Sequence, residues 1–130
     1  MKNGVKDFTQ LDAWKMARQL RSEIYKASKI FPRDETYALI SQMRRSAISV
    51  TANFAEGYLR YSVQENIQFC RQCRASAYEL RDHCTAALDS GYISKKVFDE
   101  LNALGISVIK LLNGYIRATM TGQQNAKKST

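Results

Sequence analysis

Residues 42–57 read Gln-Met-Arg-Arg-Ser-Ala-Ile-Ser-Val-Thr-Ala-Asn-Phe-Ala-Glu-Gly, and this stretch decides the fold because it carries two stripes at helical spacing. The apolar stripe recurs at intervals of three and four residues and consists of Ile40, Met43, Ala47, Val50 and Phe54. The polar stripe lies roughly 140° around the helix from it and consists of Gln42, Arg45, Ser49, Asn53 and Glu56. An ordinary solvated face is rich in Lys and Glu, so the composition of this polar stripe indicates a surface that contacts another molecule or another helix.

Three interpretations of the polar stripe are open: a seam between subunits, a nucleic-acid surface, or a buried polar network inside one bundle. We favour the subunit seam, and therefore assign Gln42, Ser49, Asn53 and Glu56 to an oligomer interface. Arg44 lies off the stripe, so we expect it to be more exposed than Arg45 and to contact a partner first.

The flanking sequence predicts three further helices and a single domain over residues 1–121. Thr9 with Asp12 resembles a capping box at the start of the first helix, which Pro32 closes. Asp34 is the expected N-cap of the second helix, and Gly57 is its expected left-handed stop. Ser62 and Ser94 are expected to cap the third and fourth helices, with Gly91 ending the third.

Residues 122–130 lack periodicity and predict a disordered basic tail. Short connections between four helices favour an all-α, up-down-up-down antiparallel four-helix bundle.

The fourth helix is unusually apolar. Its main face consists of Val97, Leu101, Leu104, Val108, Leu111 and Tyr115, and the residues Ile106, Ile109, Leu112 and Ile116 widen it. Such a helix is either deeply buried or shared with another subunit. We favour sharing, and add Ile109 and Ile116 to the predicted oligomer interface.

The order Gln-x-Arg-Arg-x-x-x-Ser-x-x-x-Asn-x-Ala-Glu-Gly in residues 42–57 resembles a bacterial four-helix-bundle family encoded in intervening sequences of 23S ribosomal RNA genes. That family is related to the accessory variability determinant proteins of diversity-generating retroelements. Other matching landmarks are Trp14, Ala17, Ile24-Tyr25, Phe31-Pro32, Tyr37, Ser62 with Glu65, Glu79-Leu80 and Gly91-Tyr92-Ile93. The resemblance implies a homopentameric ring with a central opening, and a reverse transcriptase as a partner. Cys70 and Cys73 depart from the family pattern.

The formal net charge of +8 predicts an acidic partner, for which nucleic acid is the commonest class. The alternative is a basic protein whose charge has no specific partner. Residues 42–81 contain six arginines and no lysine, which suits bidentate contact with phosphate. Arg71, Arg74, Tyr78 and Arg81 form one stripe in which phosphate contact and base stacking are combined. These arginines could instead bridge to Glu79, to Asp82 or to an adjacent subunit.

The predicted nucleic-acid-binding residues are Arg44, Arg45, Arg60, Arg71, Arg74, Tyr78 and Arg81, with Lys110 and Arg117 as weaker candidates and Tyr58 and Tyr61 as further stacking residues. No group of side chains suggests groove-specific readout, so binding is expected to be largely independent of sequence.

Other chemistries find little support in the sequence. Cys73 and Cys84 would lie about 16 Å apart along one helix, which argues against a shared metal ion, and the expected cytoplasmic setting disfavours disulfides. His83 is the only histidine and no Ser or Cys is obviously activated by it. We therefore expect no enzyme activity, no metal and no cofactor. The first residues lack the apolar core of a secretory signal, and no apolar run could span a bilayer.

These observations favour a non-catalytic nucleic-acid-binding scaffold for RNA or DNA, in the cytoplasm, acting as a homo-oligomer. The alternative is a protein-interaction or assembly module whose positive charge is incidental.

Overall fold

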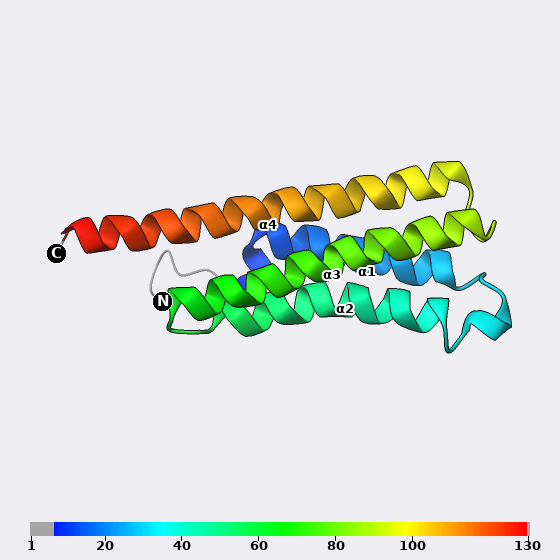
Figure 1. Cartoon of the computed structure of the whole chain (residues 1–130), viewed down its shortest axis with the longest axis horizontal. Coiled ribbons are helices and arrows are strands. Elements are labelled where there is room, and N and C mark those ends of the chain that lie inside the picture. The colour runs from blue at the N-terminus through cyan, green and yellow to red at the C-terminus, as the bar shows by residue number, and fades with distance from the viewer. Residues whose placement is uncertain (1–6, 130) are drawn as a thin grey trace.

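The computed structural model describes residues 7–129, with side chains described through Gly122. Four α-helices pack as an antiparallel bundle (Figure 1): α1 (Asp12–Ser28), α2 (Leu39–Tyr58), α3 (Val63–Asp89) and α4 (Lys95–Ser129). Two short 3₁₀ helices, η1 (Phe8–Gln10) and η2 (Arg33–Glu35), precede α1 and α2. Each long helix packs against the next along the chain, and α4 closes the bundle against α1. The predicted all-α four-helix architecture is confirmed.

The core forms where the apolar stripes of the helices meet. On α2 the predicted stripe is buried from Met43 to Phe54, and only Ile40, at the start of the helix, stays half-buried. Burial of such side chains supplies most of the free energy of folding, at about 25 cal/mol per Å² of apolar surface. The most extensive packing is between α2 and α3. Their shared seam therefore anchors α3, whose opposite side meets α4.

Several helix ends follow the predicted local chemistry. The Ser62 Oγ accepts a hydrogen bond from the Glu65 backbone N–H at 3.3 Å, and the Ser94 Oγ accepts one from Val97 at 3.1 Å. Gly91 has φ of +78°, the left-handed conformation expected of a residue that follows a helix end. These three predictions are confirmed: Ser62 caps the start of α3, and Gly91 and Ser94 place the turn between α3 and α4.

Other helix ends differ from the predictions. The capping box forms between Asp7 and Gln10, around η1, so Thr9 and Asp12 are not its members. Asp34 lies inside η2, and it is Glu35 whose Oε1 accepts a hydrogen bond from the Leu39 backbone N–H at 3.2 Å. The extra 3₁₀ turns precede α1 and α2 and displace the caps expected for those two helices.

Gly57 does not stop α2 in a left-handed conformation. It lies inside the helix, where an added Cβ would come within 2.5 Å of the Phe69 Cβ on α3. Its role is to allow close approach of two helices rather than to supply a positive φ.

The helix α4 continues past Gly122 to Ser129, where the sequence predicts a disordered tail. Ala, Lys and Gln in this stretch are strong helix formers, and one glycine costs only about 1 kcal/mol relative to alanine. The C-terminal end of α4 extends beyond α3 (Figure 1). Within the described part of the chain, no helix is both long and apolar enough to cross a membrane.

Candidate nucleic-acid interface

Two arginines of α3 are held across the seam to α4 by asparagine side chains. The Arg74 Nη1 donates a hydrogen bond to the Asn113 Oδ1 at 2.7 Å, and the Arg81 Nε donates one to the Asn102 Oδ1 at 2.9 Å. Both pairs are partly buried. An asparagine oxygen accepts the hydrogen bond but carries no charge, so each guanidinium keeps its full positive charge.

A glycine of α4 makes room for one of these arginines. A Cβ added at Gly105 would lie 3.0 Å from the Arg81 Cγ, so the stem of Arg81 rests directly on the α4 backbone. The same guanidinium lies over the Tyr78 ring, with its Cζ 5.8 Å from the ring centroid. Arg81 is therefore positioned by three neighbours, while 53% of the Tyr78 side chain remains exposed.

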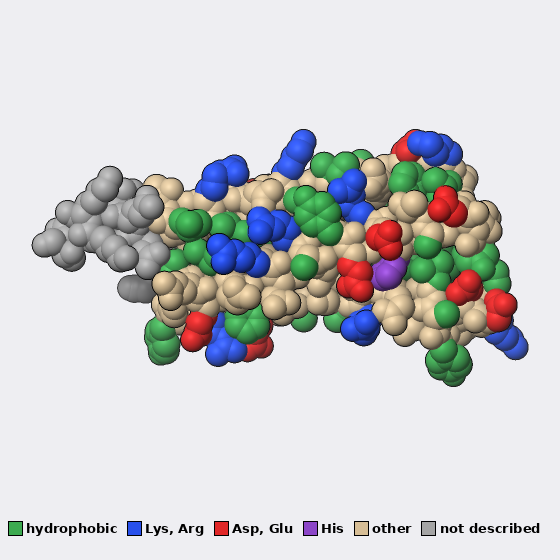
Figure 2. All heavy atoms as spheres, viewed as in Figure 1, with side chains coloured by type: hydrophobic (Ala, Val, Ile, Leu, Met, Phe, Trp, Pro, Cys, Tyr) green, Lys and Arg blue, Asp and Glu red, His purple; other side chains and the backbone are tan. Residues whose placement is uncertain are grey.

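Most of this face carries positive charge, and its carboxylates, Glu79 and Asp82, lie beside Arg81 in the sequence. Residues 66–78 and 101–122 contain Arg71, Arg74, Lys110 and Arg117 but no Asp or Glu. Figure 2 shows several Lys and Arg side chains gathered over α3 and α4 on the left half of this view, with acidic side chains beside the histidine, toward the right end and at the lower left. Among the described residues, none of Arg71, Arg74 and Arg81 forms an ion pair with a carboxylate. In the part of the chain that the structure describes, Glu79 and Asp82 form no ion pair with these arginines, and the Glu79 Oε2 instead lies 3.6 Å from the His83 Nε2.

Arg44 and Arg45 lie elsewhere, on α2. The Arg44 Nε donates to the Ser28 Oγ at 2.9 Å, and its guanidinium lies 4.7 Å from the centroid of the Tyr25 ring. Arg44 is thus half-buried against α1, whereas Arg45 is exposed and bonded to Gln42 at 2.8 Å. The expectation that Arg44 is the more exposed of the two is wrong, because the end of α1 covers its side of α2.

Arg60 and the remaining aromatic candidates lie at the end of α2 and in the connection to α3. Arg60 forms an ion pair with Glu56, which neutralises its charge, and it also covers the Phe69 ring. Tyr58 is half-buried and stacks on Phe54, while Tyr61 is fully exposed. The structure therefore separates Arg44, Arg45 and Arg60 from the α3–α4 cluster, and their contact with nucleic acid stays a prediction.

The middle of the polar stripe on α2 is engaged within the chain. The Ser49 Oγ lies 2.8 Å from the Ser76 Oγ on α3, and the Asn53 Nδ2 donates to the Ser49 Oγ at 2.9 Å. This is the arrangement expected of a polar network inside one bundle. At the two ends of the stripe Gln42 and Glu56 pair with Arg45 and Arg60, as described above. Their place in a subunit interface stays a prediction.

The apolar width of α4 has an explanation inside the bundle. Ile109 and Ile116 are buried in the core of the single chain, together with Leu112. Their burial accounts for the apolar character of this side of α4 without a second subunit. Their assignment to an oligomer interface stays a prediction.

The three cysteines lie buried on α3 as free thiols. Burial raises the pKa of the Cys70 thiol to about 11 and that of Cys84 to about 12, and it raises the pKa of Cys73 as well. Thiols in this state are protonated and poor nucleophiles at neutral pH. Among the residues that the structure describes, no three His, Cys, Asp or Glu side chains are grouped so as to hold a metal ion.

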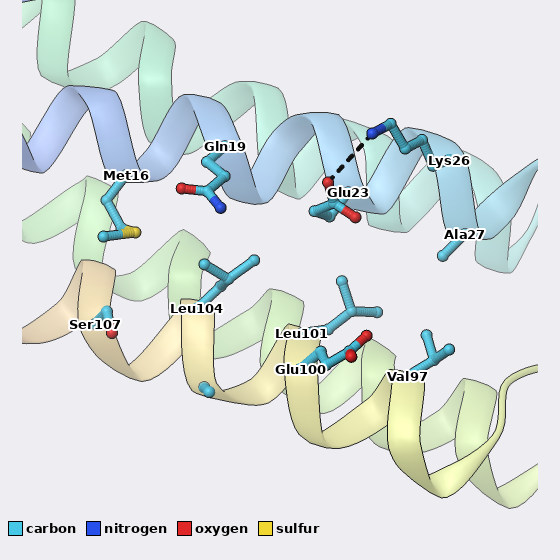
Figure 3. A pocket seen from close by; sticks show the side chains of 11 residues that line it. Met16, Gln19, Glu23, Lys26, Ala27, Val97, Glu100, Leu101, Leu104 and Ser107 are labelled. Atoms are coloured by element: carbon cyan, nitrogen blue, oxygen red, sulfur yellow. Dashed lines mark hydrogen bonds and ion pairs between the residues drawn. The ribbon is translucent and has the colours of Figure 1, made fainter.

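A second surface feature is a groove between α1 and α4 with a volume of about 670 Å³. Figure 3 shows apolar side chains from both helices facing it, among them Met16, Leu101 and Leu104. Glu23 and Glu100 lie along its rim, where Glu23 pairs with Lys26. The groove and the arginine cluster lie on different sides of α4, since α4 packs against α1 on one side and α3 on another, and α1 and α3 are not neighbours in the bundle.

Sequence reasoning missed Asn102, Gly105 and Asn113. The signal that could have identified the two asparagines is their separation of 11 residues, which brings side chains back to nearly the same face after three helical turns. Only tertiary packing shows that these two asparagines bind Arg74 and Arg81 on α3.

The comparisons with known proteins agree with this fold. A family model described as 23S rRNA-intervening sequence protein matches residues 9–114. The chain is also similar to a crystal structure at 1.70 Å resolution of a protein with unknown function from the S23 ribosomal protein family of Bacteroides thetaiotaomicron VPI-5482. That likeness has a TM-score of 0.73 and 18% identity, and covers 80% of this chain and 97% of the other. At this identity it establishes the fold alone. No curated protein matches the chain.

Proposed function

The chain belongs to the 23S rRNA-intervening sequence protein family, and we propose that it is a non-catalytic scaffold that binds RNA or DNA through the α3–α4 face. The observation that carries the proposal is the cluster of Arg71, Arg74 and Arg81, which has no carboxylate partner among the described residues. Unneutralised guanidiniums on one face attract polyanions and contact phosphates in a bidentate manner. Phosphate contacts carry no sequence information, so the binding is largely independent of sequence.

The proposal assigns no covalent step to the chain. Its buried thiols have raised pKa values. His83 lies beside Glu79, with no described Ser or Cys hydrogen-bonded to it. The cluster on α3 and α4 consists of cations and amides, which bind anions but offer no general base.

The first prediction concerns two arginines of this cluster. We expect R71Q/R74Q to weaken binding of a labelled oligonucleotide at least tenfold at low salt, and to lower the slope of log K against log salt by about 1.4–1.8, because two phosphate contacts are lost. Fluorescence anisotropy across a salt series measures both quantities.

The matched control is K15Q/R18Q, which removes the same charge from exposed positions of α1. We expect that variant to keep the wild-type slope, since α1 is not a neighbour of α3 in the bundle. Equal losses in the two variants would mean that only total charge matters. Absence of binding by the folded wild-type protein at low salt would overturn the proposed function.

We also propose that the chain assembles as a homopentameric ring, which rests on the family resemblance. A ring would place five copies of the arginine cluster around one axis and raise the local potential by several kT. The family's relation to retroelement accessory proteins makes a reverse transcriptase the partner that we propose for the assembled form.

The alternative function is a protein-interaction module whose charge is incidental. The α1–α4 groove favours this alternative, because apolar side chains facing a surface groove are typical of interaction sites. Protein purified at low salt distinguishes the two functions. Co-purifying nucleic acid, seen as a raised ratio of nucleic-acid to protein absorbance, supports the scaffold, and its absence favours the module.

A further inference from the structure

We infer that the seam between α3 and α4 is a preformed site for an unpaired stretch of polynucleotide, in which Arg74 and Arg81 each contact a phosphate and Tyr78 stacks on a base. This inference rests on the proposed function and specifies the ligand of the same face. It depends on three features of the seam: neutral partners for the arginines, their spacing, and the exposed aromatic ring between them.

The arginines are fixed without being neutralised. Asn113 and Asn102 accept hydrogen bonds from Arg74 and Arg81 at 2.7 and 2.9 Å. A carboxylate in either place would hold the guanidinium equally well but would cancel its charge. An amide therefore leaves the charge for an external anion, and it reduces the side-chain entropy that is lost when the anion binds.

The two fixed guanidiniums follow the same face of α3. Seven residues separate Arg74 from Arg81, which is two helical turns or about 10.5 Å along the axis. Tyr78 lies between them on that face, and Arg71 continues the row one turn before Arg74. The order along the helix is therefore cation, cation, aromatic ring and cation, which matches a strand whose phosphates flank a base.

The Tyr78 ring is available for stacking. One contact of the ring is with the Arg81 guanidinium, while about half of the side chain is exposed. In a duplex the faces of the bases are stacked on one another, whereas an unpaired strand presents them. Stacking of bases on an aromatic side chain tolerates any sequence because every base has a π-face. The seam thus suits a single strand better than a duplex.

The test compares a 5′-labelled oligouridine with a duplex of the same length by fluorescence anisotropy. We expect the wild-type protein to bind the single strand more tightly. We expect Tyr78→Leu to weaken single-strand binding by about 5- to 150-fold, the range of one base stacked on an aromatic residue, and to weaken duplex binding much less.

The second variant replaces the two asparagines that bind Arg74 and Arg81 by aspartates, which have nearly the same shape but carry a negative charge. In N102D/N113D each arginine meets a carboxylate, so we expect a loss of single-strand affinity and a fall of about 1.4 in the salt slope, as for two phosphates of a single strand. The control Q19E/S22D adds the same negative charge at exposed positions of α1, and it should keep the wild-type slope. Circular dichroism checks that all variants are folded.

Each outcome bears on a different claim. Equal affinity for both ligands, together with no effect of Tyr78→Leu, would overturn this inference and leave the proposed nucleic-acid scaffold standing. A wild-type salt slope in N102D/N113D would overturn the phosphate contacts of Arg74 and Arg81. Absence of binding to either ligand would overturn the proposed function itself, and this inference with it.

Discussion

At the scale of single residues, the glycines of this bundle act through the space that they leave. A Cβ at Gly57 would lie 2.5 Å from the Phe69 Cβ, a distance that forces α2 and α3 apart. A Cβ at Gly105 would press on the flexible stem of Arg81 instead. Gly114 is different again, since its nearest neighbour would be the Arg117 Nη2 at 4.0 Å. The same residue type therefore has three different structural roles.

This difference predicts opposite effects of one substitution. We expect Gly57→Ala to lower the free energy of unfolding by about 1–3 kcal/mol through overpacking against Phe69. We expect Gly114→Ala to raise it by about 0.5–1 kcal/mol, because alanine is the better helix former and its Cβ would meet only the flexible end of Arg117, at 4.0 Å. Urea unfolding followed by circular dichroism measures both changes. Shifts of the same sign in the two variants would contradict the close approach at Gly57.

At the scale of elements, α3 has two chemically opposite sides. Its buried side carries Cys70, Cys73 and Cys84 among apolar residues, and its side toward α4 carries the arginine cluster. Desolvation raises the pKa values of the thiols because a buried thiolate loses its hydration. The helix α3 therefore contributes both to the hydrophobic core and to the surface that carries the arginine cluster.

The raised thiol pKa values predict that stability falls in alkaline solution. Between pH 9 and about 11 the thiols of the unfolded chain lose protons while the folded chain keeps them. The unfolded state then binds fewer protons, so the free energy of unfolding falls as the pH rises, by up to about 1.4 kcal/mol per pH unit for each thiol.

Urea unfolding at pH 8, 9, 10 and 11 measures this slope. Cys70→Ala should be less stable than wild type at every pH because it loses buried volume, yet its stability should fall less steeply above pH 9. A slope identical to that of the wild type would mean that the Cys70 thiol ionises alike in the folded and unfolded states.

At the scale of the whole molecule, the α1–α4 groove and the arginine cluster lie on different sides of α4. This separation allows one face to contact a second copy while the other contacts nucleic acid. Apolar side chains in a groove of about 670 Å³ become buried when a second chain covers them.

The proposed pentameric ring predicts that the wild-type protein has a mass about five times the 14.8 kDa of the chain in multi-angle light scattering. Ala103→Arg places a long cation in the groove and should shift that mass toward the single chain. Ala118→Arg adds the same charge at an exposed position outside the groove and should leave the mass unchanged. A wild-type mass of one chain would overturn the proposed ring. Unchanged assembly in Ala103→Arg would place the interface elsewhere.

The sequence by itself determined the helices and the bundle. The stripe from Met43 to Phe54 and the caps at Ser62 and Ser94 depend on residues within a few turns of one another, so periodicity and local hydrogen bonding identify them. The same reasoning identified Arg71, Arg74, Tyr78 and Arg81 as one face of one helix.

Only the tertiary structure decided which neighbour each of the key residues contacts. Arg44 is occupied by the end of α1, Arg74 and Arg81 meet neutral asparagines of α4, and Gly57 faces Phe69 instead of ending its helix. Each outcome depends on a neighbour at least twelve residues away in the chain. The physical reason is that helical periodicity specifies the side of a helix on which a residue lies, whereas packing specifies the side chain that it meets there.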